Sequence, residues 1–575
     1  MIRRANSGKS LTAPFAVLDI EAAKRRPDGE WESSWDTFRV AQFVTSGGVE
    51  VKCETPAQLT QEVERFQGRV FAHYGGRYDF FFLDEPSTLT LSGSGILRAQ
   101  LGRATLYDSW FLFQMSLAKL GKAVGGKQKH EGKSDAIAHL SDAETAEHCL
   151  NDCHVLLQGL NSHREWCANR GHESPRWPAT AGGTAVYCLE AYEPDGVEHL
   201  GKEHFDLETW MQQYAAVTGG RVELWRIGRV KGPVHSYDIN SSYPQSWCDA
   251  PLPLGPWIRV THETGAPAVY RATVKQSRRF LPVVAPGHVW RYDGEVWLTS
   301  EELARVRECG GDATIHEGWS CLSESRWFAR DFAAQLFKAK QHGDPWAKVG
   351  VNSAHGKFGQ SIIQTTHVKR GGNWEVDFEL GFPSWHQRPL ISAFVLARAR
   401  LRLHAVLTAL REAGWSVYYV DTDCAHTDCP PSEFPGVLGE SLGEWKHEGE
   451  ASEAVYVAPK VYGLRMKDGE LKMASKGLPR KQVTWDAMRA AASGEVVKFS
   501  SDDGLVSFRS QKGAWGPRQQ HSQRALRAQT GGKKRGYSQT GETGRLSYED
   551  DEACEGGEGG AAAVSAGARR APRRR

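Results

Sequence analysis

Short apolar runs bounded by polar residues mark the first part of the chain. Phe15–Ile20 and Val70–His73 are such runs, and Tyr78–Leu83 is a third. Runs of this length beside glycine or acidic residues are typical of buried strands. Ala143–Leu160 instead places apolar residues every three or four positions, which predicts an amphipathic helix. The pattern therefore predicts an α/β unit at the start of the chain.

Longer helical patterns replace the short runs further along. Arg326–Lys340 and Ala393–Glu412 predict helices in a second unit that opens near Gly219. Thr366–His386 has strand-like runs around a glycine pair and predicts a hairpin. From Glu549 the chain is acidic and rich in Gly and Ala, and it ends in arginines, so we expect a disordered tail. Together these patterns predict a multidomain protein, α/β first and then α+β.

Composition narrows the class of protein. The chain has 575 residues, 40% of them hydrophobic and 24% charged, and its net charge of +2 does not point to a nucleic-acid partner. Met1–Pro14 lacks the apolar stretch of a signal peptide. No run approaches the roughly 18 apolar residues of a membrane helix. The 11 cysteines are odd in number and show no regular framework. We expect a soluble cytoplasmic protein with reduced thiols and no membrane segment.

Two local patterns resemble sites of other chemistry. The metal-ligand types within His148–His154 crowd into two helical turns, whereas zinc sites of this style use two separated pairs. We interpret Cys149 and Cys153 as helix packing. Gly8–Ser10 resembles the end of a phosphate-binding P-loop, but Arg3 stands where that motif needs its first glycine. Neither pattern is assigned a function.

Two acidic residues close together near position 420 are suited to a metal site. On a strand, Asp421 and Asp423 would point to one face, about 7 Å apart. Two carboxylates on one face repel unless a cation lies between them, and a divalent metal is such a cation. Asp238, at the end of another strand-like run, would supply a further ligand. Lys348 and Asn352 are four residues apart and share a helical face, where a lysine suits a triphosphate.

The three segments that carry these residues resemble motifs A, B and C of family B DNA polymerases. The family patterns are D-x-x-S-L-Y-P, K-x-x-x-N-S-x-Y-G and D-T-D. Thr218–Arg221 is similar to the glycine pair that tracks template, and Lys460–Tyr462 to the K-x-Y motif that holds the primer end. The resemblance spans roughly residues 15–545 and implies a right-hand polymerase, with an antiparallel palm sheet, helical fingers and a small thumb. The matching segments are Tyr237–Pro244, Lys348–Gly356 and Tyr419–Asp423.

This resemblance implies a role for each matching residue. Asp238 and Asp423 would hold the polymerase metals, with Asp421 as a supporting carboxylate. Tyr243 would pack beneath the incoming sugar and exclude a 2′-hydroxyl. The nucleotide site would comprise Ile239, Tyr243, Lys340, Lys348 and Asn352, and the DNA contacts Tyr74, Gly219, Gly220, Lys460 and Tyr462.

Three positions depart from the family pattern. Ser242 replaces a leucine, and Val217 stands where a tyrosine usually precedes the glycine pair. His355 replaces the motif B tyrosine, so we expect an effect on nucleotide discrimination or fidelity.

Four further candidate metal ligands, all acidic, lie within the first 152 residues. Asp19 and Glu21 share one face of a predicted strand, Asp79 follows a Gly-Gly turn, and Asp152 lies on the predicted helix. The set suits a two-metal site that hydrolyses a phosphodiester.

The same set resembles the Exo I, II and III motifs of DEDD 3′→5′ proofreading exonucleases, which have an RNase H-like fold. By this resemblance Asp19, Glu21, Asp79 and Asp152 are metal ligands. Tyr74 stands where an asparagine is expected, which should alter the grip on the primer strand. His148 replaces the catalytic tyrosine, and a histidine can still orient water.

The resemblance implies a DNA-dependent DNA polymerase with proofreading, using Mg²⁺ or Mn²⁺, two ions per active site. Its partners would be template-primer DNA and dNTPs. The short chain points to the phage and linear-plasmid branch of the family. By this resemblance we expect priming by a terminal protein. We expect the enzyme to work in the host cytoplasm. The expected domains are an exonuclease at 1–200, palm and fingers at 201–455, a thumb at 456–545 and a disordered tail at 546–575.

Three other functions remain open. The chain could be a stand-alone exonuclease with a degenerate polymerase half, but the Asp238 and Asp423 pair argues against it. It could be a non-catalytic, polymerase-like DNA-binding protein, which all seven acids oppose. It could also be an RNA-synthesising or RNA-templated enzyme, although Tyr243 favours deoxynucleotides.

Overall fold

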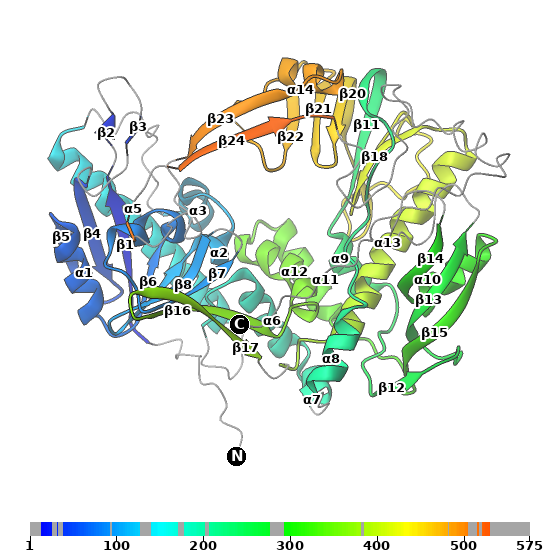
Figure 1. Ribbon diagram of the computed structural model, residues 1–575, viewed down its shortest axis with the longest axis horizontal. Helices are drawn as coiled ribbons and strands as arrows, with labels where there is room; N and C mark the ends of the chain where they lie inside the picture. The colour runs from blue at the N-terminus through cyan, green and yellow to red at the C-terminus, as the bar shows by residue number, and fades with distance from the viewer. Residues whose placement is uncertain are drawn as a thin grey trace.

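The computed structural model places two large sheets on opposite sides of the molecule, with helices between them (Figure 1). Among the described residues, no helix is both long enough and apolar enough to cross a membrane. The structure describes residues 13–22, 24–25, 31–32, 38–92, 95–126, 140–170, 177–201, 206–276, 292–380, 384–480, 482–503, 515–516 and 520–528.

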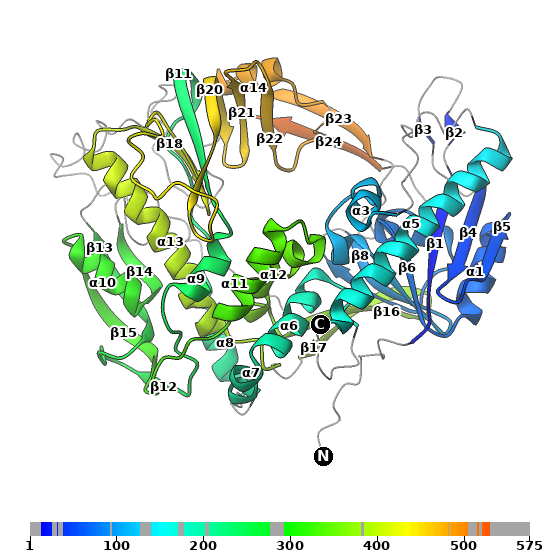
Figure 2. The same ribbon diagram turned by 180° about the vertical axis from the view of Figure 1, so that it is seen from behind.

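A nine-stranded mixed sheet forms the N-terminal part of the fold. β1 lies inside it, parallel to β6 and antiparallel to β4. α5 packs on one face and α1 on the other, as seen from behind in Figure 2. The predictions of two strands and one helix here are confirmed. The elements are β1 (Phe15–Glu21), β4 (Val40–Thr45), α1 (Pro56–Arg65), β6 (Arg69–Ala72), β9 (Ala104–Asp108) and α5 (Asp142–Ala168).

Alternation along β1 decides which side chains meet α5. Phe15 and Val17 belong to the buried cluster that includes Cys153 and Leu156 of α5, whereas Ala16 and Leu18 belong to the cluster on the opposite face. Because side chains on a strand alternate between faces, the next odd-numbered residues of β1 continue on the α5 side. The acids predicted at i and i+2 on this strand are therefore directed toward α5.

The prediction of a third strand at Tyr78–Leu83 is wrong. The chain forms two short 3₁₀ helices instead, η2 (Gly75–Arg77) and η3 (Asp79–Phe82). A Cβ on Gly76 would lie 1.9 Å from the carbonyl oxygen of Ile96, so this turn passes directly against the neighbouring strand. The phenylalanines of η3 are fully buried. Burial alone explains the apolar run, because short buried helices and strands share this pattern.

A seven-stranded antiparallel sheet forms the second layer, as expected for a palm. β11 is its long central strand and pairs with both β19 and β20. α13 covers one face, where its Leu403 and Leu407 pack with Tyr237 and Val420 of the sheet. The elements are β10 (Val222–Leu224), β11 (Gly228–Ile239), α13 (Pro389–Glu412), β18 (Val417–Asp421), β19 (Cys424–Thr427) and β20 (Trp445–Ala458).

Three helices fill the space beside this sheet (Figure 1). α12 (Pro345–Phe358) begins where Asp344 accepts hydrogen bonds from the backbone N–H groups of Trp346 and Ala347. Trp166 Nε1 of α5 donates to the same carboxylate at 2.7 Å, so the N-terminal unit helps to fix the start of α12. The other two helices are α9 (Ser242–Cys248) and α11 (Arg330–Gln341), the second beginning four residues later than predicted.

A separate four-stranded sheet lies between α9 and α11 in the sequence. It has its own buried cluster, to which α10 contributes Leu303 and Val306. Figure 1 shows it beyond α13, on the far side from the N-terminal sheet. Its elements are β12 (Trp257–Val260), β13 (Ala268–Gln276), β14 (Tyr292–Thr299), α10 (Ser300–Glu308) and β15 (Asp312–Cys321).

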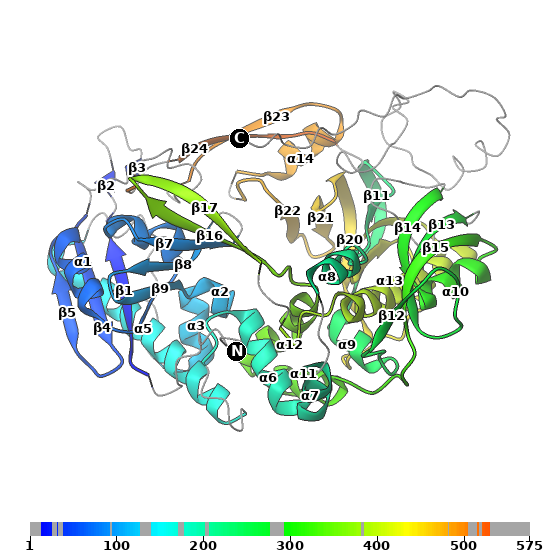
Figure 3. The same ribbon diagram turned by 60° about the horizontal axis from the view of Figure 1, so that its bottom comes forward.

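The predicted hairpin is present and joins the N-terminal sheet. β16 (Ile363–Arg370) pairs with β17 (Asn373–Leu380), and Gly371 and Gly372 between them have φ values of 56° and 83°. Two positive φ values suit a tight two-residue turn, which explains the glycine pair. β16 also pairs with β7 (Thr88–Ser92), so the hairpin extends the sheet across a gap of more than 250 residues in sequence (Figure 3).

The C-terminal elements continue the seven-stranded sheet and then leave it. β21 (Val461–Met466) and β22 (Leu471–Ser475) extend the sheet, and α14 (Trp485–Ala492) packs against β20. β23 (Val497–Asp503) and β24 (Gln520–Leu526) form a separate pair. The tail expected at 546–575, and part of the expected thumb, lie outside the described residues.

Besides the pairing of β16 with β7, two side-chain contacts that both use Glu85 hold the hairpin to the N-terminal unit. Its carboxylate accepts a hydrogen bond from Trp374 Nε1 at 2.7 Å and forms an ion pair with Lys369. We expect Glu85→Gln to loosen the hairpin, because it removes a half-buried charged partner, a change that costs about 1–3 kcal/mol. Hydrogen exchange of residues 366–368 should then quicken. Glu375→Gln, which changes an exposed ion pair on the same hairpin, is the control and should leave that exchange unaltered.

Candidate active sites

Asp238 and Asp423 come together at the centre of the antiparallel sheet. Asp238 lies near the end of β11, opposite Cys424 of β19, and the backbone N–H of Ile239 donates to the Asp423 carbonyl at 2.7 Å. Burial, and then the charge of Asp423, raises the pKa of Asp238 to about 7. Burial, and then Asp421, raises the pKa of Asp423 to about 6. Two neighbouring carboxylates repel each other when both are ionised, and a divalent cation between them would stabilise both charges.

The strand argument for Asp421 and Asp423 is wrong in its geometry. β18 ends at Asp421, and Thr422 reverses the chain with a φ of 60°. Asp421 therefore does not share a strand face with Asp423. It is bound instead by the Nζ of Lys460, and Tyr419 donates its hydroxyl to Asp421 at 2.8 Å. Asp421 accordingly holds the lysine that the resemblance assigned to the primer end.

Residues from four separate segments meet around Tyr243. The Tyr243 and His355 rings stack with centroids 3.8 Å apart. A Cβ on Gly220 would lie 2.6 Å from Thr422 Oγ1 and 2.8 Å from the Tyr243 hydroxyl, so only glycine fits there. Burial lowers the pKa of His355 to about 4, so this imidazole is neutral near pH 7. The predicted steric position thus has a neutral aromatic partner on α12.

Lysines predicted for the triphosphate approach Asp238 from the helices. Lys340 Nζ on α11 donates to Ser241 Oγ at 2.9 Å. Burial, and then the charge of Lys348, lowers the pKa of Lys340, whereas Asp238 opposes that shift. Lys348 and Asn352 are both exposed on α12, one turn apart. Two lysines that repel each other beside the carboxylates suit a polyanion.

Several arginines on α13 support this site and escaped the sequence argument. Arg400 is buried, and its guanidinium donates to Glu302 and to the carbonyl of Gly219 at 3.0 Å. Arg402 donates to the carbonyl of Ser242 at 3.1 Å, at the start of α9. The available signal was the arginines at positions 398, 400 and 402 inside an otherwise buried helix.

The remaining predicted DNA contacts lie next to the same sheet. Tyr462 is on β21, and its ring lies 5.1 Å from that of Tyr419. Lys460 has a positive φ of 65° in the turn before β21. The glycine pair precedes β10, where the Arg221 carbonyl accepts from the Thr422 N–H at 2.6 Å. DNA contact by these residues stays a prediction.

The second set of acids assembles between β1 and α5. The Glu21 Oε1 and His148 Nδ1 atoms are 3.1 Å apart. Ligand atoms of Glu21, His148 and Asp152 all lie within 4.8 Å of one another, which fits a divalent ion. Asp79 accepts the N–H of Ile20 at 3.1 Å. Burial, and then Asp108 and Glu21, raises the pKa of Asp79 to about 8.

Asp19 lies on the same strand and meets the cysteines of α5. Cys149 Sγ donates to the Asp19 carbonyl at 3.1 Å, and Cys149 and Cys153 are fully buried against the sheet. The interpretation of these cysteines as packing residues is confirmed.

Asp108 is a buried acid that the sequence argument missed. It ends β9 and accepts the N–H groups of Tyr74 at 3.0 Å and Trp110 at 2.9 Å. Burial raises the pKa of Asp108 to about 6. Tyr74 has a positive φ of 64°, which Asp108 stabilises, and its ring lies 5.8 Å from that of Trp110. An acid directly after an alternating apolar strand was the available signal.

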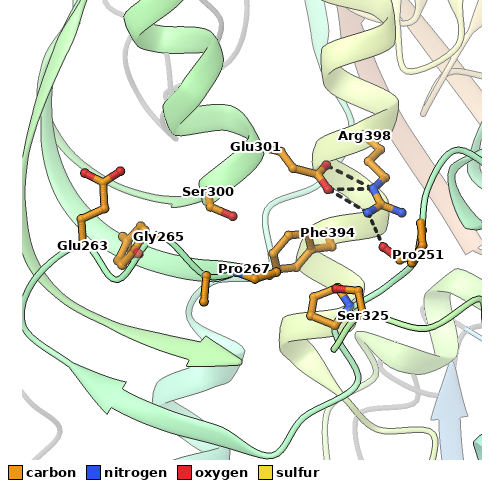
Figure 4. A pocket seen from close by; sticks show the side chains of 12 residues that line it. Pro251, Glu263, Gly265, Pro267, Ser300, Glu301, Ser325, Phe394 and Arg398 are labelled. Carbon is orange, nitrogen blue, oxygen red and sulfur yellow. Dashed lines mark hydrogen bonds and ion pairs between the residues drawn. The ribbon is translucent and has the colours of Figure 1, made fainter. Parts of the chain in front are cut away.

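A cavity of about 310 Å³ lies away from both acidic sites, between the four-stranded sheet and α13 (Figure 4). Arg398 points into it and is bound by Glu301 and by the carbonyls of Ala250 and Pro251. These contacts tie the four-stranded sheet to α13, and we assign the cavity no chemistry.

Taken together, the mixed N-terminal sheet carries one acidic cluster, and the antiparallel sheet carries a separate carboxylate pair. The chain superposes on phi29 DNA polymerase complexed with primer-template DNA, with a TM-score of 0.71 and 16% identity, over 89% of this chain and 100% of that one. The complex of phi29 DNA polymerase with incoming nucleotides gives a TM-score of 0.69, with 16% identity and the same coverage.

Sequence comparison agrees with this likeness of fold. The DNA-directed DNA polymerase of Enterobacteria phage PRD1 is 23% identical over 445 residues, which is 71% of this chain and 75% of the relative. The DNA polymerase of Streptococcus phage Cp-1 is 30% identical over 287 residues, 42% of this chain and 48% of that relative. No protein-family model matches. The resemblance to family B polymerases of the phage branch is confirmed.

The contrast between the two glycines of the pair gives a test of the packing around Tyr243. We expect Gly220→Ala to destabilise the protein by about 1–3 kcal/mol, because its Cβ would overpack Thr422 and Tyr243. Gly219→Ala is the matched control, since nothing lies within 4 Å of its added Cβ. Chemical unfolding of both variants measures the difference. Equal stability of the two variants would contradict the packing described here.

The carboxylate pair predicts a pH dependence of stability in the absence of metal. The folded pKa values of Asp238 and Asp423, about 7 and about 6, exceed the usual unfolded value of about 4. The folded state then binds more protons, so its stability falls as pH rises from about 4 to about 7. Asp238→Asn should flatten this fall and stabilise the protein at pH 8 in EDTA. Urea unfolding across that range measures the slope, and an Asp238→Asn profile parallel to the parent would contradict it.

Proposed function

We propose that this chain is a DNA-directed DNA polymerase with a proofreading 3′→5′ exonuclease. The observation that carries the proposal is the meeting of Asp238, Asp423 and Tyr243 with the lysines of α11 and α12. These groups come from separate segments. The carboxylates offer ligands for cations, the lysines offer a binding site for a polyanion, and the Tyr243 ring lies beside them. The relatives, which are named DNA polymerases, support the same function.

In the polymerase site, two Mg²⁺ or Mn²⁺ ions held by Asp238 and Asp423 would activate a primer 3′-hydroxyl and neutralise the leaving pyrophosphate. Lys348 and Lys340 bind the triphosphate of the dNTP and position it, and Asn352 and Ile239 line the nucleotide pocket. Tyr243, supported by His355, packs beneath the deoxyribose. The glycine pair, Lys460 and Tyr462 contact the template-primer.

In the exonuclease site, ions held by Asp19, Glu21, Asp79 and Asp152 would supply a metal-bound water for hydrolysis of the terminal phosphodiester. Tyr74 contacts the frayed primer strand from its position beside Trp110. A single strand is the preferred substrate, because a paired primer end must first melt to reach this separate unit.

We further propose the division into exonuclease at 1–200, palm and fingers at 201–455, thumb at 456–545 and a tail at 546–575. About a hundred residues, including the four-stranded sheet, separate the first two polymerase motifs, and the hairpin of β16 and β17 follows the second. Both features support priming by a terminal protein, and the hairpin supports displacement of the non-template strand. The phage relatives support a location in the host cytoplasm.

We predict that Asp423→Ala removes nucleotide incorporation and leaves primer degradation intact. Its carboxylate serves the polymerase metals, and losing such transition-state stabilisation costs at least roughly 10²–10³-fold in rate. Extension and degradation of one labelled primer, with and without dNTPs, measure both activities. Asp152→Ala is the reciprocal control, which should extend the primer but not degrade it. Extension by Asp423→Ala at matched folding would contradict the assignment and favour a stand-alone exonuclease.

We also predict that Tyr243→Val relaxes sugar selection. The ring fills the space that a 2′-hydroxyl would need, so a smaller side chain should raise the efficiency of rNTP incorporation relative to dNTP. The ratio of kcat/KM for the two nucleotides measures the change. An unchanged ratio would show that Tyr243 is not the steric barrier.

A further inference from the structure

The cluster between β1 and α5 contains a nitrogen donor among its oxygens. Its ligand atoms come from Glu21, His148 and Asp152 and lie within 4.8 Å of one another. His148 is 6% exposed and Asp152 is 2% exposed, so both side chains are held inside the protein. They are four residues apart on α5, which places them on one face of the helix toward the strand that carries Glu21.

The separation of the donor atoms matches a coordination shell. Ligands about 2.1 Å from an ion lie roughly 3.0–3.4 Å from their neighbours in octahedral or tetrahedral geometry. The Glu21 Oε1 and His148 Nδ1 atoms are 3.1 Å apart. The same separation allows a direct hydrogen bond between the two side chains, which a bound ion would replace, and the Asp152 carboxylate lies within 4.8 Å of both atoms.

The charge around the cluster also calls for a cation. Asp79 is held beside β1, where its carboxylate accepts the N–H of Ile20 at 3.1 Å. A divalent ion held here would offset the mutual repulsion of several buried carboxylates.

We propose that His148 is itself a metal ligand, so that the exonuclease site holds a first-row transition ion such as Mn²⁺ in preference to Mg²⁺. This rests on the proposed exonuclease and names its metal. Imidazole nitrogen favours Mn²⁺ and the later transition ions, whereas Mg²⁺ prefers oxygen ligands alone. The polymerase carboxylates Asp238 and Asp423 offer only oxygen. One chain then carries two sites with different metal preferences.

The experiment measures bound metal directly, in the full chain with Asp238→Asn and Asp423→Asn to remove ions from the polymerase site. Mn²⁺ is titrated and followed by electron paramagnetic resonance, and pulsed measurements detect magnetic coupling to a ligated ¹⁴N nucleus. We expect a ¹⁴N coupling in this parent. Adding His148→Gln should abolish the coupling and weaken Mn²⁺ binding by at least about tenfold. Mg²⁺ should displace the ion only in large excess.

His154→Gln is the matched control. His154 lies on the same helix, is half-buried and pairs with Glu50 at 3.0 Å, outside the cluster. It should leave both the coupling and the affinity unchanged. If His148→Gln fails to fold, as judged by its unfolding transition, the parent spectrum alone still tests the proposal.

The outcomes separate the metal assignment from the proposed activity. Bound Mn²⁺ without ¹⁴N coupling in the parent overturns the inference, and so does a His148→Gln variant that retains the coupling. Degradation of single-stranded DNA by the unmodified chain, measured separately, tests the exonuclease itself. A ¹⁴N coupling without any such degradation supports the metal assignment and overturns proofreading.

Discussion

The chain reversal at Thr422 determines the geometry of the larger site. Its φ of 60° is uncommon for a residue with a branched side chain, and its N–H is held by the Arg221 carbonyl. The reversal directs Asp423 toward Asp238 and leaves Asp421 to Lys460. It also presents the Thr422 side chain to the place where Gly220 and Tyr243 meet. Carboxylates, glycine pair and aromatic ring thus depend on one backbone conformation.

α5 connects the two acidic sites. Its first half supplies His148 and Asp152, and its last turns reach the cap of α12, where Trp166 donates to Asp344. Arg170, just beyond the helix, forms an ion pair with the same carboxylate. α12 in turn carries Lys348 and Asn352. The placement of α12 therefore depends on a helix whose other end carries the acidic cluster beside β1.

Sequence reasoning succeeded where the local sequence pattern alone determines the local structure. The strands around Phe15–Ile20, the helix carrying Asp152 and the glycine turn of the hairpin follow from periodicity and turn chemistry. It failed where tertiary contact decides the outcome. The apolar Tyr78–Leu83 run forms a short helix and not a strand, because its apolar composition reflects only burial, which a strand and a short helix share. Nothing local distinguishes an extended Asp421–Asp423 segment from a reversal, and the difference depends on Arg221, two hundred residues earlier.

The hairpin of β16 and β17 has a consequence for the order of the chain in space. A segment encoded after residue 360 completes a sheet that begins at residue 15, so no single cut divides the protein into self-contained halves. Deleting the hairpin would leave β7 as an uncovered sheet edge, and such edges recruit strands from other molecules. A shortened version that keeps β7 but lacks the hairpin therefore needs charged or proline substitutions along β7 to prevent such pairing.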